Sequence, residues 1–184
     1  MSHQRTLIRQ KVIALLTREK TPGEWPTIAQ NRVNSTRVTP YWESELPAIN
    51  VYNGTDRVDV YNQAPRQLRH DFSLIIECVA DATTDGLDDT LDAMAREVER
   101  VISVNDRLEG ECADILLNNT EITIRDNGDR YIGAARMEFR VEYYTNWPDA
   151  VDLELDNFET TDVQYDLNNQ AEADRAKDII EVEQ

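Results

Sequence analysis

The sequence holds few of the side chains that most often act in catalysis. It has two histidines, His3 and His70. His3 lies in the first residues of the chain, where a terminus commonly frays. His70 alternates in step with apolar residues along a predicted strand, which favours a hydrogen-bonded structural histidine inside the fold. A general base is the alternative interpretation, but no partner residue at a telling spacing supports it.

Five aspartates between residues 81 and 92 raise the question of a divalent metal: Asp81, Asp85, Asp88, Asp89 and Asp92. We predict that the run is not a calcium loop, which alternates oxygen ligands and requires a glycine at its sixth position. Negative charge at the start of a helix, which the helix dipole favours, is the simpler interpretation. The segment Asp126-Asn127-Gly128-Asp129 is likewise explained by a hairpin turn. A metal-dependent hydrolase stays open as a second hypothesis.

The other signatures of enzymes are missing from the sequence. It has no P-loop, GxGxxG, GxSxG or HExxH motif,. Cys78 and Cys112 have neither CxxC spacing nor paired histidines nearby, so they are predicted to be small buried apolar side chains. A disulfide or zinc site is the less favoured interpretation. We therefore expect no catalytic residues, no cofactor and no bound metal.

Charged side chains on the predicted strands are more informative. Arg136, Glu138, Arg140, Glu142 and Tyr144 alternate with apolar residues, so they share the outer face of one strand. They could form cross-strand ion pairs facing water, or the rim of an interface with another subunit.

Residues 32–69 hold five arginines, and together with the outer face they supply the candidate interface. The candidate interface residues are Arg32, Arg37, Arg57, Arg66, Arg69, Arg136, Arg140 and Tyr144.

The overall charge restricts the classes of partner. The net charge is −17, with 36 acidic against 19 basic residues, which disfavours binding to free nucleic acid or to an anionic membrane. No apolar run approaches the roughly 18 residues of a spanning helix. The N-terminus lacks the apolar core of a signal peptide, so we expect synthesis in the cytosol.

The acidic residues are concentrated at the C-terminus. Residues 149–184 hold 12 acidic and 2 basic side chains. A proline at the end of a strand-like run, in Trp147-Pro148, marks the boundary,. We predict a domain over residues 1–147 and an extended acidic arm over 148–184, in which residues 171–180 could be helical.

Hydrophobic periodicity predicts the elements of the domain. Helical stripes extend over residues 4–20 and 85–103, and alternating strands over 47–52, 68–80, 120–126 and 130–145. Weaker strand signals occur at 28–38 and 57–61, with Asn53-Gly54 as a turn between strands,. These elements predict an α+β fold: a mainly antiparallel sheet of four to five strands, with two amphipathic helices packed on one face.

The order of these features resembles the tail-terminator family of lambda-like and related bacteriophages. The resemblance covers roughly residues 6–145. It rests on short segments: Arg32-Val33-Asn34, Arg37-Val38-Thr39-Pro40, Glu45-Leu46-Pro47-Ala48-Ile49-Asn50-Val51-Tyr52, Ile75-Ile76-Glu77-Cys78, the helix pattern over residues 91–99, and Ala135, Phe139, Val141 and Tyr143.

This resemblance implies a structural virion protein with no enzymatic activity. The family forms a hexameric ring that caps the tail tube, ends its polymerisation and meets the head–tail connector, while DNA passes through the hole. The implied partners are other copies of the chain, the tail tube protein, the connector or stopper protein, and the sheath if the tail contracts. Another neck, connector or tail-completion protein of similar fold is an alternative. The arm of about 37 residues departs from the small members of the family.

The acidic arm and the basic region over residues 32–69 could meet between neighbouring subunits of such a ring. Removal of residues 149–184 should then weaken assembly, measured as the mass of the oligomer by light scattering. An unchanged oligomer would contradict this pairing.

Overall fold

The computed structural model describes residues 3–82, 86–126, 130–147, 160–165 and 176–181, with side chains up to residue 147. The chain divides into two compact units, residues 1–147 and 148–184. Within the described residues, no helix has the length and the hydropathy needed to cross a membrane.

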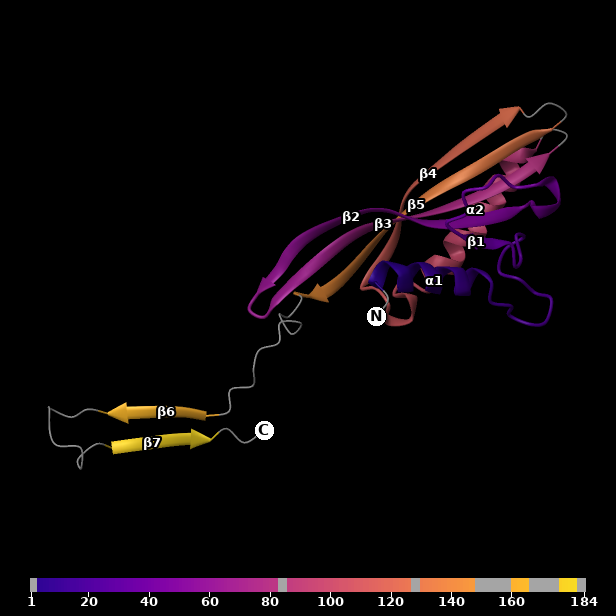
Figure 1. The fold of residues 1–184 in the computed structure, drawn as a ribbon. Helices are drawn as coiled ribbons and strands as arrows, with labels where there is room; N and C mark the ends of the chain where they lie inside the picture. Colours follow the sequence, from indigo (N-terminus) through magenta and orange to yellow (C-terminus); the bar gives the residue numbers. More distant parts are fainter. Residues whose placement is uncertain (1–2, 83–85, 127–129, 148–159, 166–175, 182–184) are drawn as a thin grey trace. The chain divides into compact units, whose positions relative to one another are not determined.

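The first unit is built around one mixed sheet of five strands (Figure 1). In spatial order these are β1 (Val33–Ser35), β2 (Ala48–Gln63), β3 (Arg66–Ala82), β5 (Tyr131–Asn146) and β4 (Asp114–Asp126). The pair β1–β2 is parallel, whereas β2–β3, β3–β5 and β4–β5 are antiparallel. The sheet is therefore mixed, and the α+β class predicted from the sequence is confirmed.

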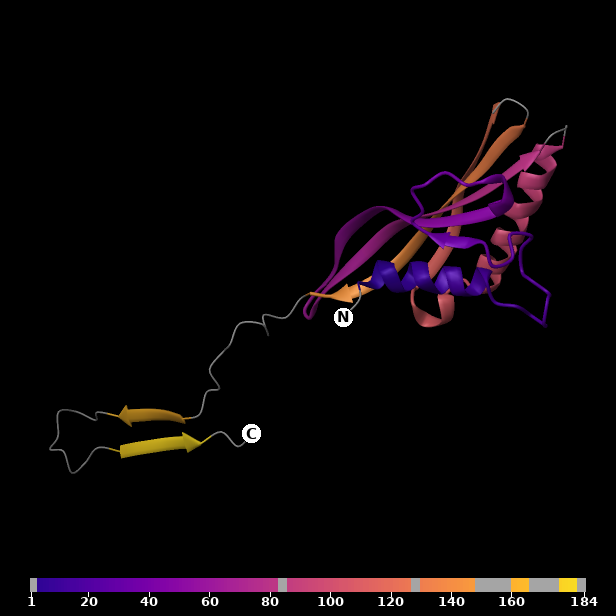
Figure 2. The same cartoon turned by 45° about the vertical axis from the view of Figure 1, so that its right-hand side comes forward.

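Two helices pack on the same face of this sheet, α1 (Gln4–Leu16) and α2 (Leu87–Val104) (Figures 1 and 2). Each presents its predicted apolar stripe to one shared core, which contains Val12 of α1 and Leu91 of α2, both fully buried. Short 3-10 turns, η1 (Glu43–Glu45) and η2 (Leu108–Gly110), occur in the connections.

Cross-strand register explains why this face is apolar. Leu74 of β3 pairs with Phe139 of β5, and Ile76 pairs with Met137, so the large side chains stand in adjacent rows on one side. At one end of the rows the large side chains stop at Gly133, where a Cβ atom would lie 2.6 Å from a methyl carbon of Leu91. Glycine here lets α2 lie directly against β5, because no side chain intervenes.

The second strand differs most from the prediction. Asn53-Gly54 does not end it: β2 continues to Gln63 through an irregularity between Asn53 and Asp56. A Cβ on Gly54 would lie 2.9 Å from the carbonyl oxygen of Ser73, so this glycine permits a close approach of two strands. The segment over residues 57–61 is thus the continuation of β2, not a separate strand.

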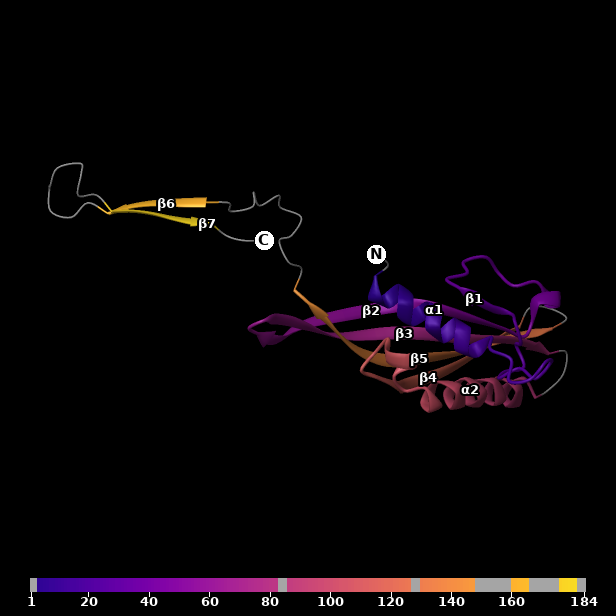
Figure 3. The ribbon, with the colours of Figure 1, turned by 90° about the horizontal axis from the view of Figure 1, so that it is seen from below.

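As a result, β2 and β3 form a long hairpin that reaches past the ends of both helices (Figure 3). Its apolar side chains lose their cover there, so Val58, Val60 and Tyr61 are exposed. On the same stretch, Trp147 packs under the guanidinium group of Arg66, 3.6 Å from the ring centroid.

The boundaries of the other elements shift in smaller ways. The first helix ends at Leu16 instead of Lys20, and the Thr17 hydroxyl after it donates a hydrogen bond to the carbonyl of Ile13. Only residues 33–35 of the predicted 28–38 strand are extended in the sheet. The predicted turn at Asn127-Gly128 lies outside the described residues.

The second unit contains a two-stranded antiparallel sheet, β6 (Thr160–Tyr165) with β7 (Ala176–Glu181). The helix predicted over residues 171–180 is wrong for residues 176–180, which are extended. The rest of that prediction lies outside the described residues.

Both cysteines are buried and free, as predicted. Burial raises the pKa of Cys78 to about 12, and likewise raises the pKa of Cys112 to about 12, with nearby carboxylates adding to each effect. The thiolate is the reactive form, so both side chains are nearly all in the inert thiol form at pH 8.

We expect native protein at pH 8 to react slowly with a thiol reagent such as DTNB, and two thiols to react at once in denaturant. The measurement is the absorbance of released thionitrobenzoate over time. Rapid modification of either cysteine in the native protein would contradict the burial described.

Candidate interaction surface

The face of the sheet opposite the helices carries most of the predicted interface residues; we call it the open face. No helix of the described residues covers it. Register places Arg57 beside Asp71, Arg69 beside Tyr144, and Glu77 beside Arg136 across neighbouring strands. Cations and carboxylates therefore alternate along β5 and pair at some positions across the strands, although Asp71 and Glu142 stand opposite each other.

These charges interact within the open face. Arg140 Nε lies 3.6 Å from an oxygen of Asp71, and a guanidinium nitrogen of Arg69 lies 3.6 Å from Asp59. Arg136 donates a hydrogen bond to Tyr52, which raises the pKa of Arg136. Exposed pairs of this kind contribute little to folding, typically about 0–1 kcal/mol. They leave a charged surface suited to matching a partner.

Apolar groups are interspersed with the charges. Ile75 is 2% exposed although it lies on the open face. At the far end, the ring of Tyr61 meets that of Tyr144 edge to face, with centroids 4.8 Å apart. Tyr144 donates a hydrogen bond to Glu142 and keeps 41% of its surface exposed. Exposed tyrosines beside arginines are typical of interfaces.

Five of the eight predicted interface residues thus share the open face: Arg57, Arg69, Arg136, Arg140 and Tyr144. Arg66 lies at the end of the long hairpin, over Trp147. The other two, Arg32 and Arg37, hold loops in place. Arg32 donates through Nε to the carbonyl of Pro47 at 2.8 Å.

Arg37 organises the loop between β1 and β2, residues 36–47. Its guanidinium binds both carboxylate oxygens of Glu45, at 2.8 and 2.7 Å, and lies 4.3 Å from the ring centroid of Tyr41. This pairing lowers the pKa of Glu45. Bidentate contacts of this geometry hold a loop in one conformation.

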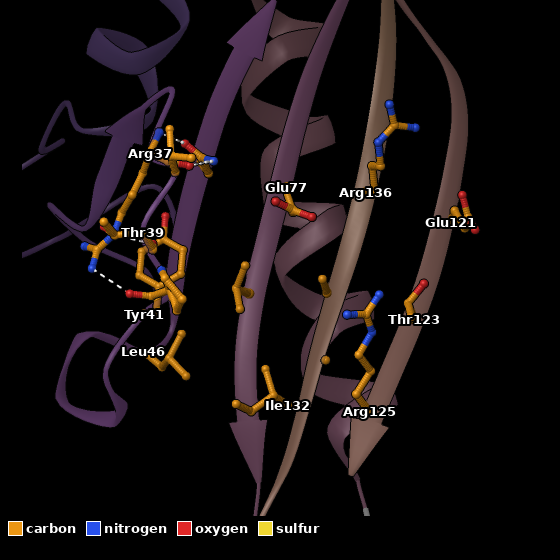
Figure 4. Close-up of a pocket in the computed structure, with 16 residues that line it drawn as sticks. Arg37, Thr39, Tyr41, Leu46, Glu77, Glu121, Thr123, Arg125, Ile132 and Arg136 are labelled. Atoms are coloured by element: carbon orange, nitrogen blue, oxygen red, sulfur yellow. Dashed lines mark hydrogen bonds between the residues drawn. The ribbon is translucent and has the colours of Figure 1, made fainter. Parts of the chain in front are cut away.

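The braced loop and the open face together enclose a hollow of about 510 Å³. Figure 4 shows its construction: loop residues Arg37, Tyr41 and Leu46 stand on one side, and Glu121 and Thr123 of β4 on the other. The floor is formed by β3 and β5, with α2 behind the sheet. Carboxylates and guanidinium groups line this hollow in nearly equal number, so it suits a protein surface better than a simple anion or cation.

His70 lies on the opposite, helix-covered face, in a buried polar cluster. Its Nδ1 is 3.2 Å from a carboxylate oxygen of Asp56, and its Nε2 is 2.9 Å from the hydroxyl of Thr145. Tyr143 donates a hydrogen bond to Asp56 at 2.9 Å, and Arg5 of α1 lies 3.5 Å from the same carboxylate.

This order of hydroxyl, imidazole and carboxylate is also that of a nucleophilic triad. His70 is only 8% exposed, and its ring stacks on Tyr143 with centroids 4.3 Å apart. A substrate therefore has little access to the imidazole. The cluster is better suited to joining α1, β2, β3 and β5, as the structural interpretation of His70 predicted.

Three aspartates of the run have ordinary structural roles. Asp81 pairs with Arg130 at 2.6 Å, and Asp88 and Asp89 occupy the first turn of α2. Asp85 lies outside the described residues. Gly86 stands sixth from Asp81, the position at which a calcium loop requires glycine, and has a φ of 103°. Within the described residues, no three His, Cys, Asp or Glu side chains converge as a metal site.

Comparison with known proteins gives distant similarity to solved structures. No protein-family model and no curated protein matches the chain. Among solved structures, it is similar to a chain of the "Virion of native gene transfer agent (GTA) particle", with 18% sequence identity and a TM-score of 0.45, over 73% of this chain and 94% of that chain. At this identity and TM-score, the match identifies neither a family nor a function.

The buried carboxylate of Asp56 depends on its donors. We expect Tyr143→Phe to lower the free energy of unfolding by about 1.5–3 kcal/mol, because a hydrogen bond to a buried charge is lost. Chemical denaturation measures this. The control is Tyr131→Phe, at a position 46% exposed, which should change stability little. Equal stabilities for the two variants would contradict the role assigned to Tyr143.

Proposed function

We propose that the chain is a structural subunit of a phage-type virion and forms a hexameric ring at the neck of the tail. The ring caps the tail tube, ends its polymerisation and joins it to the head–tail connector or stopper protein. DNA passes through its hole. The proposed partners are neighbouring copies, the tail tube protein, the connector and, in a contractile tail, the sheath.

The observation that carries the proposal is the open face. An antiparallel sheet can keep one polar face in water, and here all the helical cover of the described unit lies on one side, so the other side is free to meet a partner. The other side presents Arg136, Arg140 and Tyr144 among carboxylates, beside a rigid loop. A ring subunit needs such surfaces, because each copy must meet a neighbour through two different patches.

The sequence resemblance supports the more specific role. Its segments occupy structural positions: residues 45–52 lead from the braced loop into β2, and residues 91–99 form the buried stripe of α2. The strongly acidic composition suits a pore through which DNA must slide, because like charges repel. These features favour a ring at the neck over a subunit that grips DNA.

Two alternatives lead to different measurements. A connector or tail-completion protein of similar fold would also assemble, but on the head side and not on tail tubes. The second alternative is a metal-dependent enzyme that uses the aspartate run, in which Gly86 occupies the glycine position of a calcium loop. Millimolar calcium would raise the melting temperature of such an enzyme. A ring subunit should show no such rise.

Charge reversal on the open face tests the proposal. We expect Arg57→Glu with Arg140→Glu to weaken self-association, or assembly on tail tubes, by tenfold or more, because like charges would then face the neighbour's carboxylates. Native mass spectrometry, with and without purified tubes, measures the assembly.

The matched control is Arg96→Glu with Arg107→Glu, an equal change of charge at two exposed positions outside the open face. It should leave assembly unchanged. If wild-type protein stays monomeric alone and with tubes, the ring is wrong. If both double variants assemble like wild type, the open face is not part of the interface.

A further inference from the structure

The tip of the braced loop exposes a large aromatic side chain. Trp42 is 77% exposed and Val38 is 91% exposed. The loop is not loose at this point: the backbone N–H of Trp42 donates to a carboxylate oxygen of Glu45 at 2.8 Å, and Glu45 is held by Arg37. A tryptophan presented on a rigid support loses little conformational freedom on binding, which is typical of residues that dominate interface energy.

A second surface feature lies between the C-terminal ends of the two helices; we call it the helix-end hollow. It has a volume of about 470 Å³. Its apolar lining comes from Leu15, Pro26, Val101 and Val104, and Val104 is 78% exposed. Its charged lining consists of Arg18, Lys20 and Arg100 against a single carboxylate, Glu19.

The two features match in chemistry. Trp42 is followed by Glu43, whose side chain is 70% exposed although it pairs with Arg130. An indole with an adjacent carboxylate fits an apolar hollow with a basic rim. Arg18 already forms an ion pair with Glu109, at 3.5 Å. Arg100 is therefore the better partner for Glu43.

Their positions exclude a contact within one copy. The loop stands at the edge of the open face, where it lines the hollow shown in Figure 4. The helix-end hollow lies between α1 and α2, which cover the other face of the sheet. The two patches are therefore available for a head-to-tail contact, the kind that closes into a ring.

We propose that Trp42 of each copy inserts into the helix-end hollow of the next copy, with Glu43 facing Arg100. The proposal rests on the ring described under the proposed function and names the contact that orders neighbouring subunits. Trp42 supplies most of the attraction, and the charged pair orients it.

Single cysteines placed beside the contact test this arrangement without removing the tryptophan. Ser44→Cys lies next to the tip and Val104→Cys lies in the hollow; both positions are exposed. The native cysteines do not interfere because they are buried. With oxidised glutathione as oxidant, we expect a disulfide-linked dimer when the two variant proteins are mixed, and none from either variant alone.

The affinity test uses Trp42→Ala in the full chain, with Tyr131→Ala as the control at an exposed aromatic residue that lines neither hollow. We expect self-association, or assembly on tubes, to weaken about tenfold or more for Trp42→Ala and to stay unchanged for the control. Glu43→Arg and Arg100→Glu should each weaken it, and the two changes in one chain should restore it.

The outcomes separate this contact from the ring itself. Cross-linking of Ser44→Cys with itself would show a symmetric contact and overturn the assignment. If wild type and Trp42→Ala assemble equally, the contact is wrong while the ring stands. If removal of residues 148–184, and not Trp42→Ala, ends assembly, the acidic segment and not Trp42 makes the contact between copies. A wild-type protein that never assembles overturns both proposals.

Discussion

The fold depends on the contact between α2 and β5. Leu91 lies against Gly133 of β5, and the absence of a side chain there lets the helix lie directly on the strand. Because α1 packs on the same face, the apolar residues of α1, α2, β3 and β5 form one core. The cost of this arrangement falls on the other face, which has no helical cover among the described residues. That face carries charged side chains instead, and its polarity is what allows a sheet to stay in contact with water.

The interaction features arise from the same arrangement. The loop of residues 36–47 has to connect a short parallel strand to β2, and Arg37 with Glu45 fixes it beside the open face. The two helices converge at their C-terminal ends and leave an apolar hollow with a basic rim. Neither feature improves the packing of one copy, since Trp42 and Val104 remain largely exposed. Both become favourable only when a second surface removes them from water.

Periodicity located both helices and three long strands, because amphipathic stripes such as that of α2 are local properties of the sequence. It failed where a local signal has a non-local cause. Asn53-Gly54 resembles a turn, yet Gly54 serves to bring β2 close to Ser73. A strand that ends at Gly54 does not bring Asp56 beside His70, so the sequence does not predict the polar cluster. Five interface candidates proved to share a face because alternation predicts sidedness. Arg32 and Arg37 lie elsewhere, and charge alone does not distinguish an arginine that stabilises a loop from one that binds a partner.

The long hairpin has a mechanical consequence. Where it leaves the covered part of the sheet, Asp56 of β2, His70 of β3 and Tyr143 of β5 are joined beneath Arg5 of α1. This joint anchors the hairpin at its root on three strands and a helix. A load applied to the outer end would be transmitted to the core as the bending of a stiff lever, not absorbed by a hinge. In an assembly of the proposed kind, the domain would pass strain from one side to the other without rearranging its own core.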